Sequence, residues 1–199
     1  MALRGIVDRV LQHPAVYAAW QAPFAAQKFR PAERELNRRT VRRVLDVGCG
    51  PGTNAARFPG SDYVGVDLNP SYLSTARAKH AGLFVEADIT SADLSTLGTF
   101  DTILVNSFLH HVPDEAVERI LYQLGQRLTP DGRAHVLELV LPERRSLARA
   151  MARLDRGRYA RSVEEWCRLL GAHLEPVVIE PYAYAGGLWS MIYFQGKTR

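Results

Sequence analysis

The sequence has little cysteine. Only Cys49 and Cys167 occur among 199 residues, and they lie far apart in the chain. Two isolated cysteines cannot form a disulfide framework, and their separation is not a zinc-ligand spacing. We therefore expect no metal centre and no redox chemistry.

Long apolar runs are also missing. No run approaches the roughly 20 residues that a membrane helix needs. The amino-terminal stretch "MALRGIVDRVLQHPAVYAAW" is interrupted by Arg4, Asp8, Arg9 and His13, which is not the pattern of a signal peptide. These absences predict a cytoplasmic protein with no membrane partner.

Lysine is scarce although the chain is basic. The formal net charge is +4, and arginine supplies 22 of the 25 basic residues. The arginines are scattered, with one dense group at Arg38, Arg39, Arg42 and Arg43. Such a group more often marks a solvated helix end than a nucleic-acid footprint, so nucleic-acid binding is disfavoured.

The chain has the length and composition of a single globular domain, with 47% hydrophobic and 23% charged residues. From residue 43 onward, short apolar runs alternate with longer segments of helical period, which is typical of a parallel sheet with crossover helices. Seven strands are expected, at residues 43–48, 62–67, 82–88, 100–107, 134–141, 174–184 and 188–197. The last two strands are joined through Gly186-Gly187 as a hairpin.

Helices are expected between these strands, at residues 52–58, 70–80, 114–128 and 142–155, and again from Ser162, where Ser162 and Glu165 form a capping box. Residues 1–40 are helical in pattern and rich in aromatic side chains, including Tyr17, Trp20, Phe24 and Phe29. This segment is either an amphipathic helix packed on the sheet or a lid over a pocket.

Three glycines follow the first expected strand in "VLDVGCGPGTNAARF". Gly48, Gly50 and Gly52 occupy the first strand-to-helix turn, where glycine lets backbone approach a ligand. The spacing differs from the dinucleotide fingerprint, and Asp46 precedes the loop. A carboxylate there repels phosphate but tolerates a ligand that carries an ammonium or sulfonium group.

Two further acids end the next strands. Asp67 stands about 20 residues beyond the loop, where a carboxylate accepts both hydroxyls of a ribose. Asp88 ends the third strand and is placed to accept a hydrogen bond from an exocyclic amine. An amino-acid end, a ribose and an adenine without phosphate describe S-adenosylmethionine.

The motifs "VLDVGCGPGTNA", "YVGVDLN", "FVEADIT" and "FDTILVNSFLHHVPD" together resemble the class I S-adenosylmethionine-dependent methyltransferases. The resemblance implies an α/β, Rossmann-like fold: a seven-stranded, mostly parallel sheet with helices on both faces and an antiparallel terminal strand. It implies one domain over 1–199, with a helical lid at 1–40, a cofactor-binding half at 41–142 and a substrate side at 143–199. The cofactor residues it implies are Asp46, Gly48, Cys49, Gly50, Gly52, Asn54, Asp67, Leu68, Ala87, Asp88, Ile89, Asn106 and Ser107.

Methyl transfer requires alignment and exclusion of water, and it needs a base only when the acceptor must lose a proton. His110 and His111 follow the fourth strand, and only one of two adjacent histidines should face the pocket; His110 is favoured. Glu138 either faces the pocket or pairs with a buried base. Tyr159 is a further candidate, and Arg158 or Arg161 could meet an anionic acceptor.

The acceptor is expected to be a small molecule, methylated on oxygen, nitrogen or carbon, with S-adenosylhomocysteine as the other product. The fourth strand lacks an "NPPY"-type run, which disfavours DNA adenine. Two alternatives stay open, an RNA or protein acceptor and a non-methylating cyclase or regulatory protein on the same fold. A monomer or a homodimer is expected.

Overall fold

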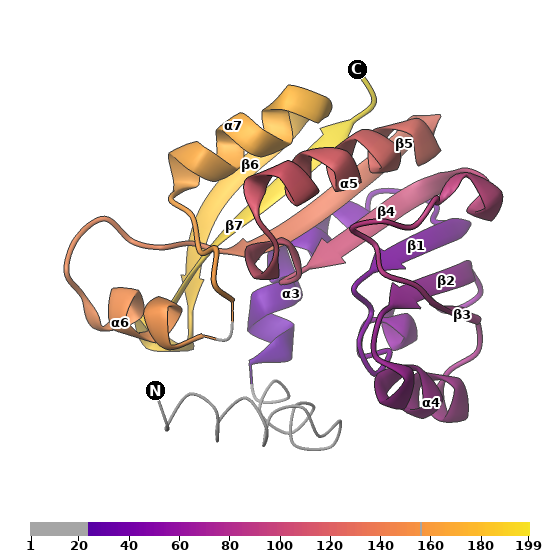
Figure 1. Ribbon diagram of the computed structural model, residues 1–199, viewed down its shortest axis with the longest axis horizontal. Coiled ribbons are helices and arrows are strands. Elements are labelled where there is room, and N and C mark those ends of the chain that lie inside the picture. Colours follow the sequence, from indigo (N-terminus) through magenta and orange to yellow (C-terminus); the bar gives the residue numbers. More distant parts are fainter. Residues whose placement is uncertain (1–23, 156) are drawn as a thin grey trace.

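The computed structural model of the chain describes residues 24–155 and 157–199, and within them one mixed sheet carries seven strands in the order β3-β2-β1-β4-β5-β7-β6 (Figure 1). The strands are β1 (Arg43–Val47), β2 (Asp62–Asp67), β3 (Leu83–Glu86), β4 (Phe100–Asn106), β5 (Leu128–Leu139), β6 (Glu175–Tyr184) and β7 (Trp189–Lys197). Strands β1 to β5 pair in parallel, and β7 is antiparallel to both of its neighbours. The predicted fold class is confirmed.

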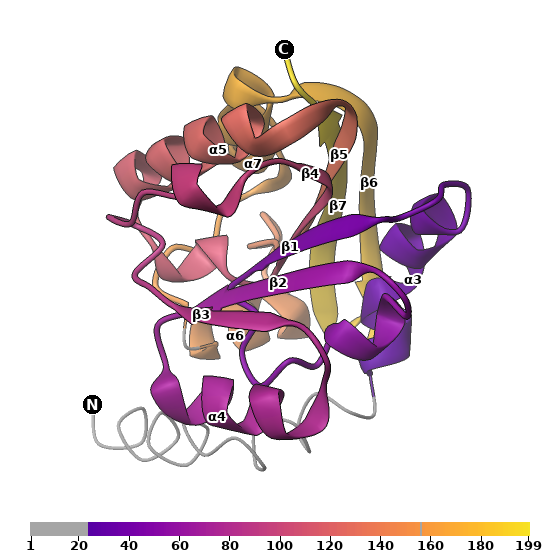
Figure 2. The ribbon, with the colours of Figure 1, turned by 90° about the vertical axis from the view of Figure 1, so that its right-hand side faces the viewer.

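Helices cover both faces of this sheet. They are α3 (Ala25–Leu36), α4 (Pro70–Lys79), α5 (Asp114–Arg127), α6 (Leu147–Leu154) and α7 (Val163–His173). Apolar residues of α5 and α7 share one core cluster with the sheet, whereas α3, α4 and α6 contribute to a second cluster. Figure 2 shows α3 and α5 on opposite sides of the strands. No described helix combines the length and apolar character that crossing a bilayer requires.

Local sequence signals set several element ends. The predicted capping box of α7 is present, with Ser162 Oγ accepting from Glu165 N and the Glu165 carboxylate accepting from Ser162 N. Helix α6 begins at Leu147, later than the predicted residue 142, because Ser146 caps it by accepting from Arg149 N.

The helix predicted at residues 52–58 is wrong. Only a short 3₁₀ turn, Ala55–Arg57, forms there. Gly52 has a positive φ of 78°, and Pro59-Gly60 follow at once, so the loop has no room for a full α-helical turn.

Strand boundaries also differ from expectation. Strand β3 ends at Glu86, which leaves residues 87–89 in a loop, and β5 starts at Leu128 with a register shift against β4. In the amino-terminal segment, Phe29 of α3 is 2% exposed and packs in the core. The described part of this segment is therefore an amphipathic helix on the sheet, while Tyr17 and Trp20 lie outside the described residues.

Candidate functional site

A cavity of about 600 Å³ opens beyond the carboxyl ends of β1, β2 and β4. This is the place where open α/β sheets bind ligands, because parallel strands present their connecting loops together there. Its lining residues are Gly48, Gly50, Val66, Asp67, Leu68, Tyr72, Ala87, Asp88, Ile89, Thr90, Asn106, Ser107, Phe108, His111, Val112 and Arg158. Nine of the thirteen residues expected to bind a cofactor line it.

The glycine loop forms one wall. Gly50 has a φ of 54°, and a Cβ built there would meet no protein atom within 4 Å. At Gly48, with a φ of 71°, a Cβ would lie 2.8 Å from the Phe108 ring. Gly52 was expected at the ligand but does not line this cavity; a Cβ there would lie 2.9 Å from His80. Its glycine serves close packing of the loop on α4.

Asp67 ends β2 with its carboxylate fixed at the cavity wall. Its Oδ2 accepts from Gly50 N and its Oδ1 from Asn69 N, both at 2.8 Å. These bonds orient the side chain, and each oxygen retains a second lone pair. A ligand diol reaching this wall can therefore donate to a carboxylate that is already in position.

The third acid, Asp88, also lines the cavity. Asp88 is exposed, and its Oδ1 accepts from the backbone N and the Oγ1 of Thr90. These hydrogen bonds lower the pKa of the Asp88 carboxyl below its ordinary value. Leu68, Ala87 and Ile89 supply apolar surface beside it, as a purine ring requires.

Asp46 differs from the expectation that it contacts the ligand. It is fully buried, does not line this cavity, and its Oδ2 accepts from the Tyr63 hydroxyl and from Asn54 Nδ2. Burial raises the pKa of this carboxyl to about 6, although both hydrogen bonds oppose the rise. Asn106 Nδ2 in turn donates to Asn54 Oδ1 at 3.2 Å. Asp46 therefore orients Asn54, which in turn orients Asn106 in the cavity wall.

His110 is also placed differently from the expectation that it faces the pocket. Its ring is 3% exposed, with Nδ1 2.7 Å from Glu138 Oε2 and Nε2 3.1 Å from Asp155 Oδ1. Burial would lower the pKa of His110, but the two carboxylates raise it to about 9. His111 lines the cavity instead, with its ring centroid 4.2 Å from that of His110.

Glu138 takes the second of its two expected roles, pairing with a buried base. Its Oε2 contacts His110, and its Oε1 accepts from the backbone N of Phe108 and of Leu109, at 2.9 and 2.6 Å. Burial would raise the pKa of Glu138, but these contacts lower it. The carboxylate thus holds the turn that follows β4.

The cluster around His110 has the residue types of a metal site, because ligand atoms of His110, His111 and Asp155 lie within 4.8 Å of one another. The two carboxylates at His110 favour the imidazolium, however, and a doubly protonated ring has no lone pair for a metal. The arrangement therefore functions as a buried ion network.

The segment after α6 supplies the far wall. Arg158 lines the cavity and forms no hydrogen bond or ion pair with any described residue, whereas Arg161 is buried and donates to Asp114 and to three backbone carbonyls. Tyr159, expected near the substrate, is 39% exposed and does not line the cavity; its backbone N donates to His110 O. Arg158 is the side chain in this segment that is placed for a ligand.

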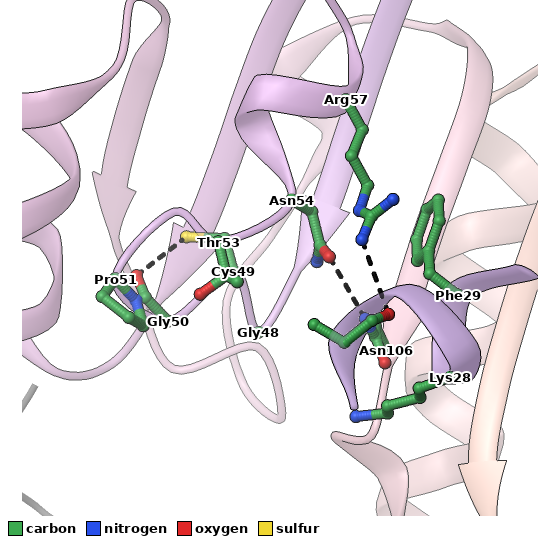
Figure 3. A pocket seen from close by; sticks show the side chains of 11 residues that line it. Lys28, Phe29, Gly48, Cys49, Gly50, Pro51, Thr53, Asn54, Arg57 and Asn106 are labelled. Carbon is green, nitrogen blue, oxygen red and sulfur yellow. Dashed lines mark hydrogen bonds between the residues drawn. The ribbon is translucent and has the colours of Figure 1, made fainter. Parts of the chain in front are cut away.

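A second, smaller pocket of about 50 Å³ adjoins the glycine loop (Figure 3). Cys49 and Asn54, both expected at the cofactor, line this pocket and not the large cavity. Lys28 and Arg57 also line it, and the sequence reasoning missed both. The sequence does contain a sign of Lys28, because its spacing of four residues from Ala32 places a lysine on the buried face of α3.

The large cavity fits S-adenosylmethionine. The open space at Gly50 admits ligand beside the backbone, Asp67 is fixed for a ribose, and an apolar wall beside Asp88 suits adenine. Residues 44–132 match a family model described as "Methyltransferase domain". Residues 44–132 therefore belong to the class I S-adenosylmethionine-dependent methyltransferase family.

Relatives within this family include a trans-aconitate 2-methyltransferase of Methylobacterium radiotolerans, 33% identical over 187 residues that cover 86% of this chain and 65% of the relative. The chain spans about half the length of the other curated relatives it matches. A solved 1,6-didemethyltoxoflavin-N1-methyltransferase of Burkholderia thailandensis is 24% identical with a TM-score of 0.70, covering 100% of this chain and 89% of that one. A Pyrococcus horikoshii protein gives a TM-score of 0.71 at 15% identity, covering 88% and 90%. Both show the same fold.

Proposed function

We propose that this methyltransferase transfers the methyl group of S-adenosylmethionine to a small carboxylic acid and forms a methyl ester. The observation that carries the proposal is Arg158, an exposed guanidinium on the cavity wall without a partner among the described residues. A guanidinium recognises a carboxylate through two parallel hydrogen bonds. His111, on the same wall, adds a polar group near the acceptor.

The lining of the cavity carries charges of both signs. Asp67 and Asp88 are its acidic residues, and they are the two carboxylates expected at the ribose and the adenine. Arg158 and His111 come from other segments of the chain. An anionic acceptor is attracted to Arg158 and repelled by the two carboxylates, so charge favours binding of the acceptor away from the acids expected at the cofactor.

Bound S-adenosylmethionine supplies a methyl group that its sulfonium already activates. The chain then has to align the acceptor oxygen and exclude water. Because a carboxylate is ionised at neutral pH, no side chain has to remove a proton. This agrees with the engagement of His110 and Glu138 by each other, which leaves neither as a base.

The relatives support an acidic acceptor. The name trans-aconitate 2-methyltransferase describes a relative that acts on a polycarboxylic acid, and 86% of this chain aligns with it. Of the oxygen, nitrogen and carbon acceptors expected from sequence, this relative therefore favours a carboxylate oxygen.

An RNA or protein acceptor is not favoured by the basic cluster at residues 38–43. This cluster precedes β1, at the opposite end of the strands from the cavity. Two of its arginines form ion pairs, Arg43 with Asp62 at 2.7 Å and Arg38 with Glu35 at 3.0 Å. The cluster therefore does not extend into the cavity lining.

The test is product formation with methyl-labelled S-adenosylmethionine and a panel of small mono-, di- and tricarboxylic acids, with matched amides and alcohols. We expect label only in products that alkali hydrolyses, because esters are labile to base. Arg158→Gln should raise KM for the acid at least tenfold, since a lost charged contact is worth about 1.5–3 kcal/mol. Arg119→Gln, an exposed change on α5, is the matched control.

Three results contradict this proposal. Alkali-stable products would indicate a nitrogen, carbon or ether acceptor. Labelled RNA or protein would restore the macromolecular alternative. Cofactor binding without methylation of any acceptor would favour a non-methylating role.

A further inference from the structure

The small pocket beside the glycine loop has a composition of its own. It shares Gly48, Gly50 and Asn106 with the large cavity, so the two spaces meet at the carboxyl end of β1. Its volume of about 50 Å³ accommodates a group of a few atoms but no ring. Whatever enters it must be the end of a molecule that lies in the large cavity.

The charged residues of this pocket have one sign. Lys28 and Arg57 line it, and no aspartate or glutamate does (Figure 3). Asn54 and Asn106 add amide groups, joined by a hydrogen bond of 3.2 Å. A pocket with two cations and no acid is built for an anionic group.

Lys28 is the cation available to such a group. Its side chain is 6% exposed, yet Nζ forms no hydrogen bond or ion pair with any described residue. Arg57 is engaged in part, over the Phe29 ring at 4.3 Å and with Glu33 at 3.5 Å. A buried ammonium without a direct partner is costly, and a bound anion would remove that cost.

The geometry points to Lys28 as the residue that binds the carboxylate of the methionine end of S-adenosylmethionine in this small pocket. The methionine end must lie beside Gly48 and Gly50 if the ribose is at Asp67 and the adenine is near Asp88. Because Gly48 and Gly50 line both spaces, a carboxylate at the methionine end can enter the pocket that Lys28 lines. The donor would thus be bound at both ends by opposite charges.

A competing explanation lies within the protein. Glu138 and Asp155 act electrostatically on Lys28, while burial lowers the pKa of Lys28 to about 8. Lys28 could therefore only balance the two carboxylates, but both are directly bonded to His110 and neither is an ion-pair partner of Lys28. The two explanations predict different effects of Lys28 on the binding affinity for a ligand that lacks a carboxylate.

The experiment is calorimetric titration of the full chain with S-adenosylmethionine and with decarboxylated S-adenosylmethionine, which keeps the amine and loses only the carboxylate. Lys28→Met preserves side-chain length and removes the charge. We expect this variant to bind S-adenosylmethionine about 10- to 100-fold more weakly and to bind the decarboxylated ligand with unchanged affinity. Lys197→Met, at an exposed ion pair with Glu175 far along β7, should bind both ligands as the wild type does.

Equal weakening for both ligands, or unchanged affinity for both, would overturn the assignment. Thermal unfolding of each variant shows whether it is folded. Lys28→Arg restores a cation and should recover most of the preference for S-adenosylmethionine over its decarboxylated form. No acceptor is present in these titrations. A failure here therefore leaves the carboxylic-acid acceptor untouched, and a failure of the acceptor proposal leaves this result standing.

Discussion

His110 Nδ1 lies 2.7 Å from Glu138 Oε2, and this buried contact joins the turn after β4 to the adjacent strand β5. The opposite ring nitrogen of His110 reaches Asp155, at the end of α6. One imidazolium therefore connects the sheet to the segment that carries Arg158. The part of the cavity wall that carries Arg158 therefore depends on this network, although His110 itself does not face the cavity.

Removing one member of this pair should be strongly destabilising. Glu138→Leu removes one of the two carboxylates that pair with the buried His110 and leaves two backbone donors unsatisfied, so we expect the free energy of unfolding to fall by about 3–5 kcal/mol. Urea denaturation measures this change. The matched control is Glu118→Leu on the exposed side of α5, where the effect should stay within about 0.5 kcal/mol. Equal losses in both variants would contradict the proposed network.

Stability should also depend on pH through His110. Its pKa rises from 6.5 to about 9 on folding, so its contribution is complete below pH 6.5 and is lost as pH rises through 9. We expect the free energy of unfolding to decrease by about 2 kcal/mol between pH 6.5 and 8. The pKa of Lys28 is lowered to about 8, so the titration of Lys28 increases stability with rising pH only above pH 8.

The measurement is urea denaturation at several pH values for the wild type and for His110→Gln, which should lose this slope. If the variant does not fold, an NMR titration of the wild-type His110 ring gives its pKa directly. A folded-state value near 6.5 would show that the carboxylates do not hold the ring protonated.

Gly157 should not tolerate a side chain. A Cβ there would lie 2.0 Å from His110 Cδ2 and 2.8 Å from His110 O. Gly157→Ala should therefore cost about 1–3 kcal/mol of stability and shift the segment that carries Arg158. KM for the acceptor should rise while the cofactor affinity stays constant. Gly171→Ala, in helix α7 with its nearest contact at 4.0 Å, is the control and should be neutral or stabilising.

Asp67→Ala should weaken the binding of S-adenosylhomocysteine by about 1–3 kcal/mol, because charge-assisted hydrogen bonds to the ribose are lost. Part of the loss arises from the loop, since Asp67 also accepts from Gly50 N. Calorimetry with adenosine and with 2′,3′-dideoxyadenosine separates the two effects. The wild type should distinguish these ligands and the variant should not; an undiminished preference in Asp67→Ala would remove the ribose assignment.

The sequence by itself determined the sheet, the glycine loop and the chemistry of the donor. Short apolar runs that alternate with helical segments set the order of strands and helices along the chain. The position of Asp67 at the cavity follows from its place at the end of β2, because parallel strands end at one edge of the sheet. The capping box at Ser162 is equally local. Each of these features depends on residues close together in the chain.

Tertiary structure decided which polar groups face the ligand. Asp46 and His110 have the residue types of site residues, but Tyr63 and Glu138, distant in sequence, bind them in the interior. Conversely, Lys28 reaches the glycine loop only because α3 packs against the far strands of the sheet. Orientation and burial result from contacts between distant segments, and a linear pattern does not specify which neighbour satisfies a given charge.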